Sequence, residues 1–344
     1  MITLLTGISA ILIFFIALHW NALQKVRQLR DVKKQEVREE RQRWSRMANR
    51  FKWAWIASLL AVIITSVMSL QGTKSVMLTH IHGLGYSGDG QQIIIPSHYG
   101  LKFYSEGTWS AGKGDKHDYM GFTSVDNGFY SSGHPEQGSN KKNPFGLVKS
   151  TDDGLSLDFL DLYGEIDFHL MSASYNTHTV YVFNPEPNSQ MNTAGLYYTK
   201  DEATTWLKSE MAGLNEAPTA LAVHPTNDSV IAVGTKDALY ISNDSGNQFE
   251  KIADLLVTSL SISSEGALFV GSFNGKSAVH RVNIEKKEWK EISLPDLGED
   301  TISYIALNPV DMSELVFSTF KMNVYISKNQ GMNWKEIVIQ GNGV

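Results

Sequence analysis

Two long apolar runs stand at the start of the chain, before a region in which short apolar runs alternate with polar turns. Residues 2–20 and 54–70 contain no Asp, Glu, Lys or Arg. A helix that crosses a bilayer needs roughly 20 apolar residues, within a range of about 17–25. No basic segment precedes the first run, no Ala-x-Ala cleavage site follows it, and the second run lies too deep for a leader. The pattern therefore predicts two transmembrane helices within residues 1–71.

The segment between these runs is basic and has the composition of a helix. Residues 1–71 contain eleven Lys or Arg and four acids, and residues 21–53 contain neither Gly nor Pro. Short basic loops remain on the cytoplasmic side of a membrane. We therefore expect a helical cytoplasmic loop, a location in the cell membrane, and an extracytoplasmic domain over residues 72–344.

The remainder of the chain repeats one pattern of short apolar runs. Residues 220–252 contain an alternating run, a turn, a second apolar run, another turn, the run Leu-Tyr-Ile and a last short run. Residues 260–292 and 304–337 follow the same order. Turn residues separate stretches rich in β-branched and aromatic side chains, and no long helical periodicity interrupts them. The pattern predicts units of four antiparallel β-strands.

A motif of the form Ser/Thr-x-Asp/Asn-x-Gly-x-x-aromatic, called the box below, occurs four times in imperfect copies. The last position of each box and two further tryptophans recur at intervals of 48, 49, 43, 40 and 45 residues. These positions are Trp109, Leu157, Trp206, Phe249, Trp289 and Trp334. Periods of about 40–50 residues are typical of repeat architectures such as propeller blades. Six four-stranded units predict an all-β domain folded as a six-bladed β-propeller.

Each box falls between the third and fourth strands of its unit, where a tight hairpin is needed. Its Asp or Asn can accept backbone N–H bonds, its Gly can adopt a positive φ, and its aromatic residue can pack between blades. These positions are Asp152, Gly154, Asp201, Trp206, Asp244, Gly246, Asn329, Gly331 and Trp334. Because Ala203 replaces Gly, Leu157 replaces the aromatic residue and Asn329 replaces Asp, we expect the box to be structural rather than catalytic.

With these boxes, residues 78–340 resemble the Asp-box, or bacterial neuraminidase repeat, propellers. That group includes sialidases, other glycoside hydrolases, sortilin-type receptors and photosystem-assembly propellers. The stretches "HIHGLGY", "HDYMGF" and "SSGHP" look more narrowly like bacterial membrane-anchored proteins that are named glycosylhydrolases. The resemblance implies the fold and leaves the function open, because one fold hosts many functions.

The charged residues of the predicted propeller exclude several classes of function. Residues 72–344 contain nineteen Lys or Arg and thirty-two Asp or Glu, which argues against a nucleic-acid or anionic-lipid surface. A sialidase grips the carboxylate of its substrate with a cluster of arginines, whose planar forks Lys cannot reproduce. This region contains one arginine, Arg281, so sialidase chemistry is excluded.

Histidines are the most informative polar residues of the propeller. Strands alternate in direction, so the links into first strands and the second-to-third loops share the face opposite the boxes; we call it the His face, and the other the box face. Six histidines fall on it: His80, His82, His98, His117, His134 and His169. Since first strands are innermost, we expect His80, His82, His117 and His169 at the mouth of the central channel, with His98 and His134 farther out. Imidazoles with carboxylates commonly bind Zn or Cu; the alternative is that each histidine bonds its own local backbone.

Three acids accompany these histidines: Asp118, Glu165 and Asp167. A glycoside hydrolase needs two such carboxyl groups across a sugar-sized cleft. Our leading expectation is a membrane-anchored propeller that binds a metal ion, a glycan or other ligand, or a protein partner at the His face, with no residue assigned to catalysis. The alternative is a glycoside hydrolase-like enzyme that acts on an envelope glycan through two of these acids.

Overall fold

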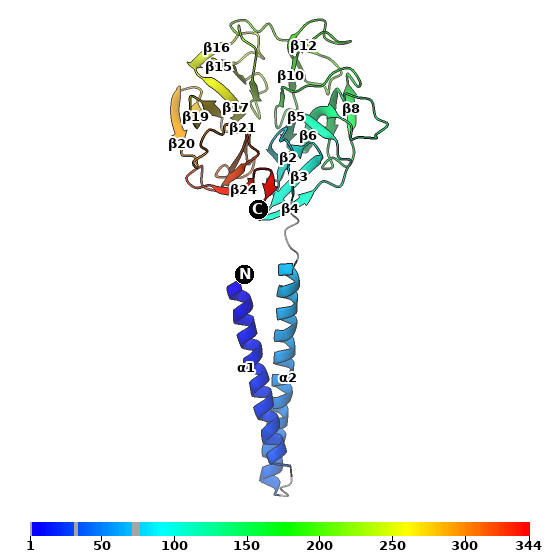
Figure 1. Cartoon of the computed structure of the whole chain (residues 1–344), viewed down its shortest axis with the longest axis vertical. Coiled ribbons are helices and arrows are strands. Elements are labelled where there is room, and N and C mark those ends of the chain that lie inside the picture. Colours follow the sequence, from blue (N-terminus) through cyan, green and yellow to red (C-terminus); the bar gives the residue numbers. More distant parts are fainter. Residues whose placement is uncertain (1, 31–33, 71–75) are drawn as a thin grey trace. The chain divides into compact units, whose positions relative to one another are not determined.

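The chain divides into two units, Met1–Lys74 and Ser75–Val344 (Figure 1). The computed structural model describes residues 2–30, 34–70 and 76–344, and the side chains of 7–30, 34–64 and 76–344. The predicted boundary between residues 71 and 72 lies outside the described residues.

The first unit is a pair of helices, α1 (Ile2–Gln28) and α2 (Gln35–Leu70). The two helices lie side by side, and Nδ1 of His19 is 2.8 Å from the carbonyl oxygen of Ala48 (Figure 1). Ala22 and Ala48 are buried, and such small side chains allow two helices to approach closely.

Both helices are long and apolar enough to cross a membrane by length and composition. The candidate spans are Gly7–Gln28 and Gln35–Ile64. With 36 residues, α2 is about 54 Å long at about 1.5 Å per residue, whereas the hydrocarbon core of a bilayer is about 30 Å thick. The basic first half of α2 is therefore in excess of what a single crossing needs.

The second unit is a six-bladed β-propeller, which confirms the predicted fold (Figure 1). Each blade is an antiparallel sheet whose strands follow one another in sequence order, and the last blade has a fifth strand. Blade 1 contains β1 (Gly85–Tyr86), β2 (Ile93–Ser97), β3 (Gly100–Ser105) and β4 (Thr108–Ala111). Blade 2 contains β5 (Asp118–Val125), β6 (Gly128–His134), β7 (Leu147–Ser150) and β8 (Asp158–Asp161). Blade 3 contains β9 (Met171–Ala173), β10 (Val180–Asn184), β11 (Gly195–Thr199) and β12 (Leu207–Lys208).

The second half of the ring has the same plan. Blade 4 contains β13 (Ala220–Val223), β14 (Ile231–Gly234), β15 (Ala238–Ser242) and β16 (Glu250–Asp254). Blade 5 contains β17 (Leu256–Ile262), β18 (Ala267–Phe273), β19 (Ser277–Asn283) and β20 (Glu288–Ile292). Blade 6 contains β21 (Ile302–Leu307), β22 (Leu315–Thr319), β23 (Val324–Ser327), β24 (Lys335–Ile339) and β25 (Asn342–Gly343).

The core of the propeller lies between its blades. The second and third strands of most blades are almost wholly buried, whereas the fourth strands β12, β16 and β20 are mainly exposed. Buried apolar side chains form six clusters, each shared by two neighbouring blades. Because a blade buries its sheet only against its neighbours, the ring must close for the last interface to form.

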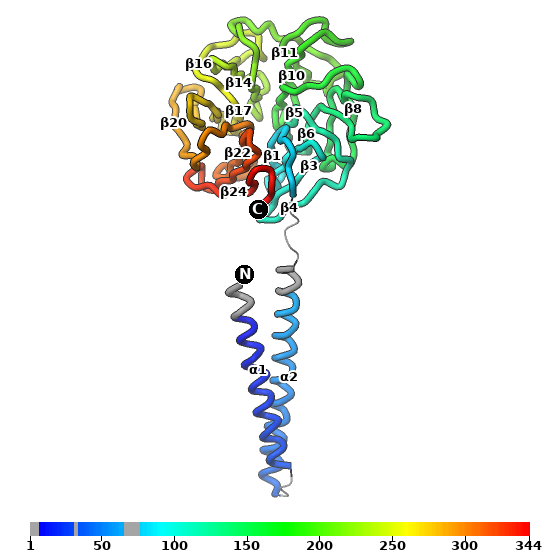
Figure 2. Tube along the Cα trace, in the orientation of Figure 1, coloured from blue at the N-terminus to red at the C-terminus, as the bar shows by residue number. Residues whose placement is uncertain are grey.

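The two ends of the propeller close the ring together. Leu78 N donates to Gly341 O at 2.7 Å, Gly343 N donates to Val76 O at 2.8 Å, and Met77 bridges Asn342. Figure 2 shows the first blade, in cyan, beside the last blade, in red. Closure therefore ties the segment that leads into blade 1 to the edge of blade 6.

The four boxes occupy the turns between third and fourth strands of blades 2, 3, 4 and 6. In blade 4, Ser242 Oγ donates to Asp244 Oδ1 at 2.7 Å, and that oxygen also accepts from Gln248 N at 2.9 Å. Gly246 N donates to Ser242 Oγ at 2.9 Å, with a positive φ of 83°. The same bonds recur in the other boxes, and Ala203 adopts the positive φ where Gly is replaced. These contacts support a structural role.

Candidate functional site

Three histidines of blade 1 lie together on the His face because two backbone segments pair there. The segment before β1 runs beside the end of β2 through a bridge between Ile81 and Ser97, and His82 N donates to Pro96 O at 3.1 Å. The backbone of His80 turns with a positive φ of 63°, and its ring stacks with that of His82, with centroids 6.1 Å apart. The turn after β2 brings the ring of His98 to 5.0 Å from His80 and 5.2 Å from His82.

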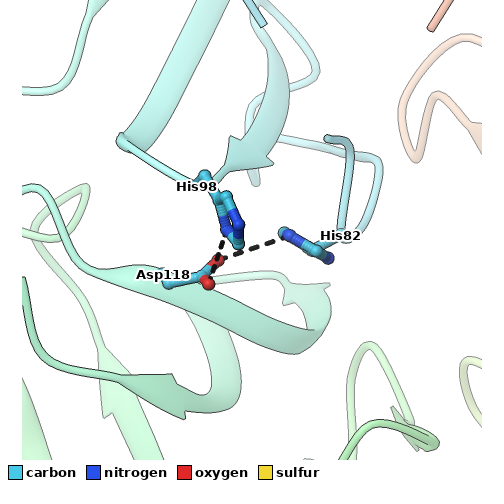
Figure 3. A group of neighbouring side chains, drawn as sticks. All are labelled: His82, His98 and Asp118. Atoms are coloured by element: carbon cyan, nitrogen blue, oxygen red, sulfur yellow. Dashed lines mark ion pairs between the residues drawn. The ribbon is translucent and has the colours of Figure 1, made fainter. Parts of the chain in front are cut away.

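Asp118, the first residue of β5, joins this group from blade 2. Its Oδ2 lies 2.6 Å from Nδ1 of His98, and its Oδ1 lies 3.4 Å from Nε2 of His82 (Figure 3). One ligand atom from each of the three side chains lies within 4.8 Å of the others. We call His82, His98 and Asp118 the first cluster.

The protonation of His82 suits a metal ligand. Burial lowers the pKa of His82, Asp118 opposes this shift, and the neighbouring rings of His98, His80 and His169 lower the pKa further. The neutral imidazole, which has a free lone pair, is thereby favoured. Nε2 of His82 and Oδ1 of Asp118 are both buried without a hydrogen-bond partner. These two atoms are therefore desolvated and available to a cation.

A second group forms around Asp167, just before blade 3. Its Oδ2 lies 2.8 Å from Nε2 of His169 and 3.1 Å from Nε2 of His134. Phe168 N donates to Ser132 Oγ at 2.9 Å, which holds this segment against blade 2. A Cβ added at Gly121, in the bulge of β5, would lie 2.3 Å from Phe168 O, so the close approach requires glycine. We call His134, Asp167 and His169 the second cluster.

Two predicted residues lie elsewhere, which corrects the expectation for them. His117 is 2% exposed, packs edge-on against Phe145, and accepts a bond from Glu136 N at 3.0 Å. Burial and the nearby Lys141 lower the pKa of His117. His117 is therefore a core residue rather than one at the mouth, because its ring packs against residues of the loop between the second and third strands of blade 2. Glu165 is bonded by Ser189, through N at 3.0 Å and Oγ at 2.9 Å, so it supports a loop.

A cavity of about 820 Å³ follows the central channel, and its lining includes His80, His82 and His169. Hydroxyl groups are frequent along its wall, and those of Ser124 and Thr258 are buried without a hydrogen-bond partner. Ligand cavities in proteins have volumes of about 300–1,000 Å³. A small polar molecule in this channel would therefore reach the imidazoles of both clusters.

Sequence reasoning missed two neighbours of the clusters. Oδ1 of Asn143, in the loop after β6, lies 2.6 Å from Nδ1 of His134. The sulfur of Met322, between β22 and β23, accepts from His80 N at 3.3 Å. Asn143 stands between a run of lysines and a proline in a loop without chemical signature, and Met322 is far away in sequence. No sequence pattern identifies either residue.

No protein-family model and no curated protein matches this chain. Among solved structures it is similar to the GH74 enzyme of Niastella koreensis, with 13% identity and a TM-score of 0.54, over 77% of this chain and 46% of that one. It is also similar to YCF48 bound to D1 peptide (13% identity, TM-score 0.47, 76% of this chain and 83% of that one). A luciferin-regenerating enzyme gives 13% identity and a TM-score of 0.49, over 71% and 85% of the two chains. At 13% identity, the similarity to the GH74 enzyme shows the propeller fold alone.

Proposed function

We propose that this protein is a membrane-anchored propeller that binds a transition metal ion at the first cluster. The observation that carries the proposal is the pair formed by Nε2 of His82 and Oδ1 of Asp118, 3.4 Å apart and both buried without a hydrogen-bond partner. Ligand atoms around a tetrahedral ion with bonds of about 2.0–2.1 Å lie about 3.3–3.4 Å apart. The pair therefore has the spacing of two ligands that share one ion.

The donor set favours Zn or Cu. Imidazole nitrogens suit both metals, and one carboxylate adds the charge that a divalent ion requires. Nδ1 of His98 lies 2.6 Å from Asp118 Oδ2, so a small rotation of its exposed ring brings it to the same ion. Three protein ligands leave a fourth position open, and the ring of His80 stands beside it. That position is available to His80, to water or to a ligand in the channel.

We propose further that the propeller is extracytoplasmic and that the basic segment between the apolar runs is cytoplasmic. The chain contains no Cys, so single introduced thiols report their own position. In intact cells, an impermeant maleimide should label a Cys at Gln137 and should not label one at Gln35. Labelling of Gln35→Cys alone would place the propeller on the cytoplasmic side and overturn this orientation.

Metal binding is tested on the detergent-solubilised full chain by isothermal titration with Zn²⁺ and Cu²⁺. The double variant His82→Ala/His98→Ala should lose at least about 100-fold in affinity, because two of three ligands are absent. His178→Ala is the matched control, since Nε2 of His178 is 2.7 Å from Asp126 Oδ1 in a pair that belongs to neither cluster. Equal affinities in the double variant and the control would overturn the assignment.

Glycoside hydrolysis is the second candidate. Asp118 and Asp167 both belong to the His face, and both have carboxylate oxygens that are buried without a hydrogen-bond donor. Two such groups can serve as acid and base if a sugar lies between them. Release of reducing ends from envelope glycans, lost in both Asp118→Asn and Asp167→Asn, would support this function. Turnover that is unaffected by either variant would exclude these acids as the catalytic pair.

A further inference from the structure

The second cluster contains a carboxylate whose environment calls for a cation. The side chain of Asp167 is 11% exposed, and its two oxygens are buried with no partner for a hydrogen bond or ion pair other than the imidazoles of His134 and His169. Burying a carboxylate without compensation is costly.

The hydrogen bonding of His134 leaves one of its nitrogens free. Nδ1 of His134 lies 2.6 Å from Oδ1 of Asn143. An amide oxygen can only accept, so Nδ1 carries the proton and Nε2 of a neutral ring carries a lone pair. That lone pair is 3.1 Å from Oδ2 of Asp167. A cation between these two atoms, either a metal ion or a ring proton, is bound by both of them.

The tautomer of His134 is one that metal-binding histidines adopt, although among the described residues only the first cluster has three ligand atoms within 4.8 Å of one another. Such a histidine usually donates its other N–H to a carbonyl or carboxylate, which fixes the ring and its tautomer. Oδ2 of Asp167 is 3.1 Å and 2.8 Å from the two Nε2 atoms, close to the spacing of about 3.3–3.4 Å between ligands of a tetrahedral ion. The side chain of His169 is 68% exposed, so its ring is free to adjust.

The second cluster lies beside the first. Asp118 and His134 are directly opposite one another in the β5–β6 pair, and opposite residues share one face of a sheet, with Cβ atoms about 4.5–5.5 Å apart. Asp118 contacts the histidines of blade 1, and His134 contacts Asp167 before blade 3. Each cluster has its own carboxylate and its own pair of imidazoles.

We propose that His134, Asp167 and His169 bind a second divalent transition metal ion beside the first, with Asn143 positioning His134. This inference rests on the proposed function, since it assigns a second ion to the same His face, but it depends on different residues. It makes the His face a two-ion centre at the mouth of the channel.

The experiment measures how many ions one chain binds. The full chain in detergent is dialysed against Zn²⁺, and bound zinc is counted by elemental analysis; Co²⁺ absorption then reports the ligand geometry. The variants are Asp167→Asn, Asp118→Asn and their double. Because His169 is exposed, His169→Ala removes a ligand without disturbing the core. Asp126→Asn, which alters the pair with His178 that belongs to neither cluster, is the control.

We expect two ions in the native chain and in Asp126→Asn, one in Asp167→Asn and in Asp118→Asn, and none in the double variant. His169→Ala should weaken the second ion by at least about tenfold. One ion in the native chain, kept in Asp167→Asn and His169→Ala and lost in Asp118→Asn, would overturn the second site alone. One ion kept in Asp118→Asn and lost in Asp167→Asn would instead uphold the second cluster and overturn the proposed function at the first. No bound ion would overturn both.

Discussion

The two faces of the propeller both carry aspartates, and their partners differ in origin. On the box face, Asp244 is bonded by Ser242 and Gln248, a few residues away in the same turn. On the His face, Asp118 and Asp167 are approached by imidazoles from other segments or blades. Moreover, oxygens of both are buried without a hydrogen-bond partner.

The origin of these partners distinguishes a structural aspartate from one in a candidate binding site. An aspartate whose oxygens accept hydrogen bonds from its own turn stabilises that turn, and few of its lone pairs remain free to bind a ligand. Hydrogen bonds from the turn lower the pKa of Asp152, Asp201 and Asp244. A buried oxygen that its surroundings leave unsatisfied costs stability and is retained where a ligand compensates it. The cross-blade aspartates fit the second description.

The largest expected contrast is between equivalent substitutions on the two faces. Asp118→Asn should lower the affinity of the first cluster for Zn²⁺ by at least about 100-fold, because it removes the charged ligand of that cluster. Asp244→Asn, which keeps an accepting oxygen in its box, should leave that affinity unchanged. Isothermal titration of both purified chains checks this. A similar loss in both would show that the box face also takes part in binding.

The box should matter for stability instead. Ser242→Ala should lower the free energy of unfolding by about 1–3 kcal/mol, because the buried Ser242 Oγ accepts from Gly246 N and donates to Asp244. Binding of Zn²⁺ at a temperature where the variant is folded should be unchanged. Urea unfolding followed by tryptophan fluorescence measures the change, with exposed Ser264→Ala in blade 5 as the control. Loss of metal binding in the folded variant would contradict the division between the faces.

The faces should also respond to acid in different ranges. Affinity for Zn²⁺ should decline below about pH 6, by about tenfold per pH unit for each imidazole that protonates. Since burial lowers the pKa of His82, its own contribution begins below the usual value of about 6.5. Titrations from pH 5 to 8 check this. An affinity independent of pH in that range would exclude imidazole ligands.

The box aspartates are expected to titrate at lower pH than the histidines. Their pKa values are lowered in the folded state, so their contribution to stability is present above the unfolded value of about 3.9 and is lost as the pH falls through the folded values. The contribution of the box aspartates to the thermal stability of the chain should therefore be nearly constant between pH 8 and 5. It should be lost below about pH 4. A loss complete by pH 5 would point to other groups.

The smallest effect is expected where the repeat itself varies. Asn329 accepts from Asn333 N at 2.9 Å in the last box, as an aspartate does in the others. Asn329→Asp should change the free energy of unfolding by less than about 0.5 kcal/mol, in the stabilising direction at pH 7 because a charged acceptor is stronger. Urea unfolding at pH 7 and pH 3 measures it, and the gain should be absent at the lower pH.

Much of the molecule follows from short-range pattern. Alternating apolar runs, turn residues and a period of 40–50 residues predicted six four-stranded blades, since a strand and its turn depend on neighbours in sequence. Local signals of the same kind predicted that the boxes lie between third and fourth strands. The same reasoning predicts that six histidines share one face, because antiparallel strands reverse direction at every turn.

The partners of those histidines were decided only by tertiary structure. Sequence grouped His117 with the channel, whereas the structure buries it. The contact between His98 and Asp118 of the next blade was not predicted. Neither Asn143 beside His134 nor Met322 beside His80 has a local signal. Contacts between blades depend on the closure of the ring, the bulge in β5 and the direction of each side chain. These arise from packing among segments far apart in sequence, which no local pattern encodes.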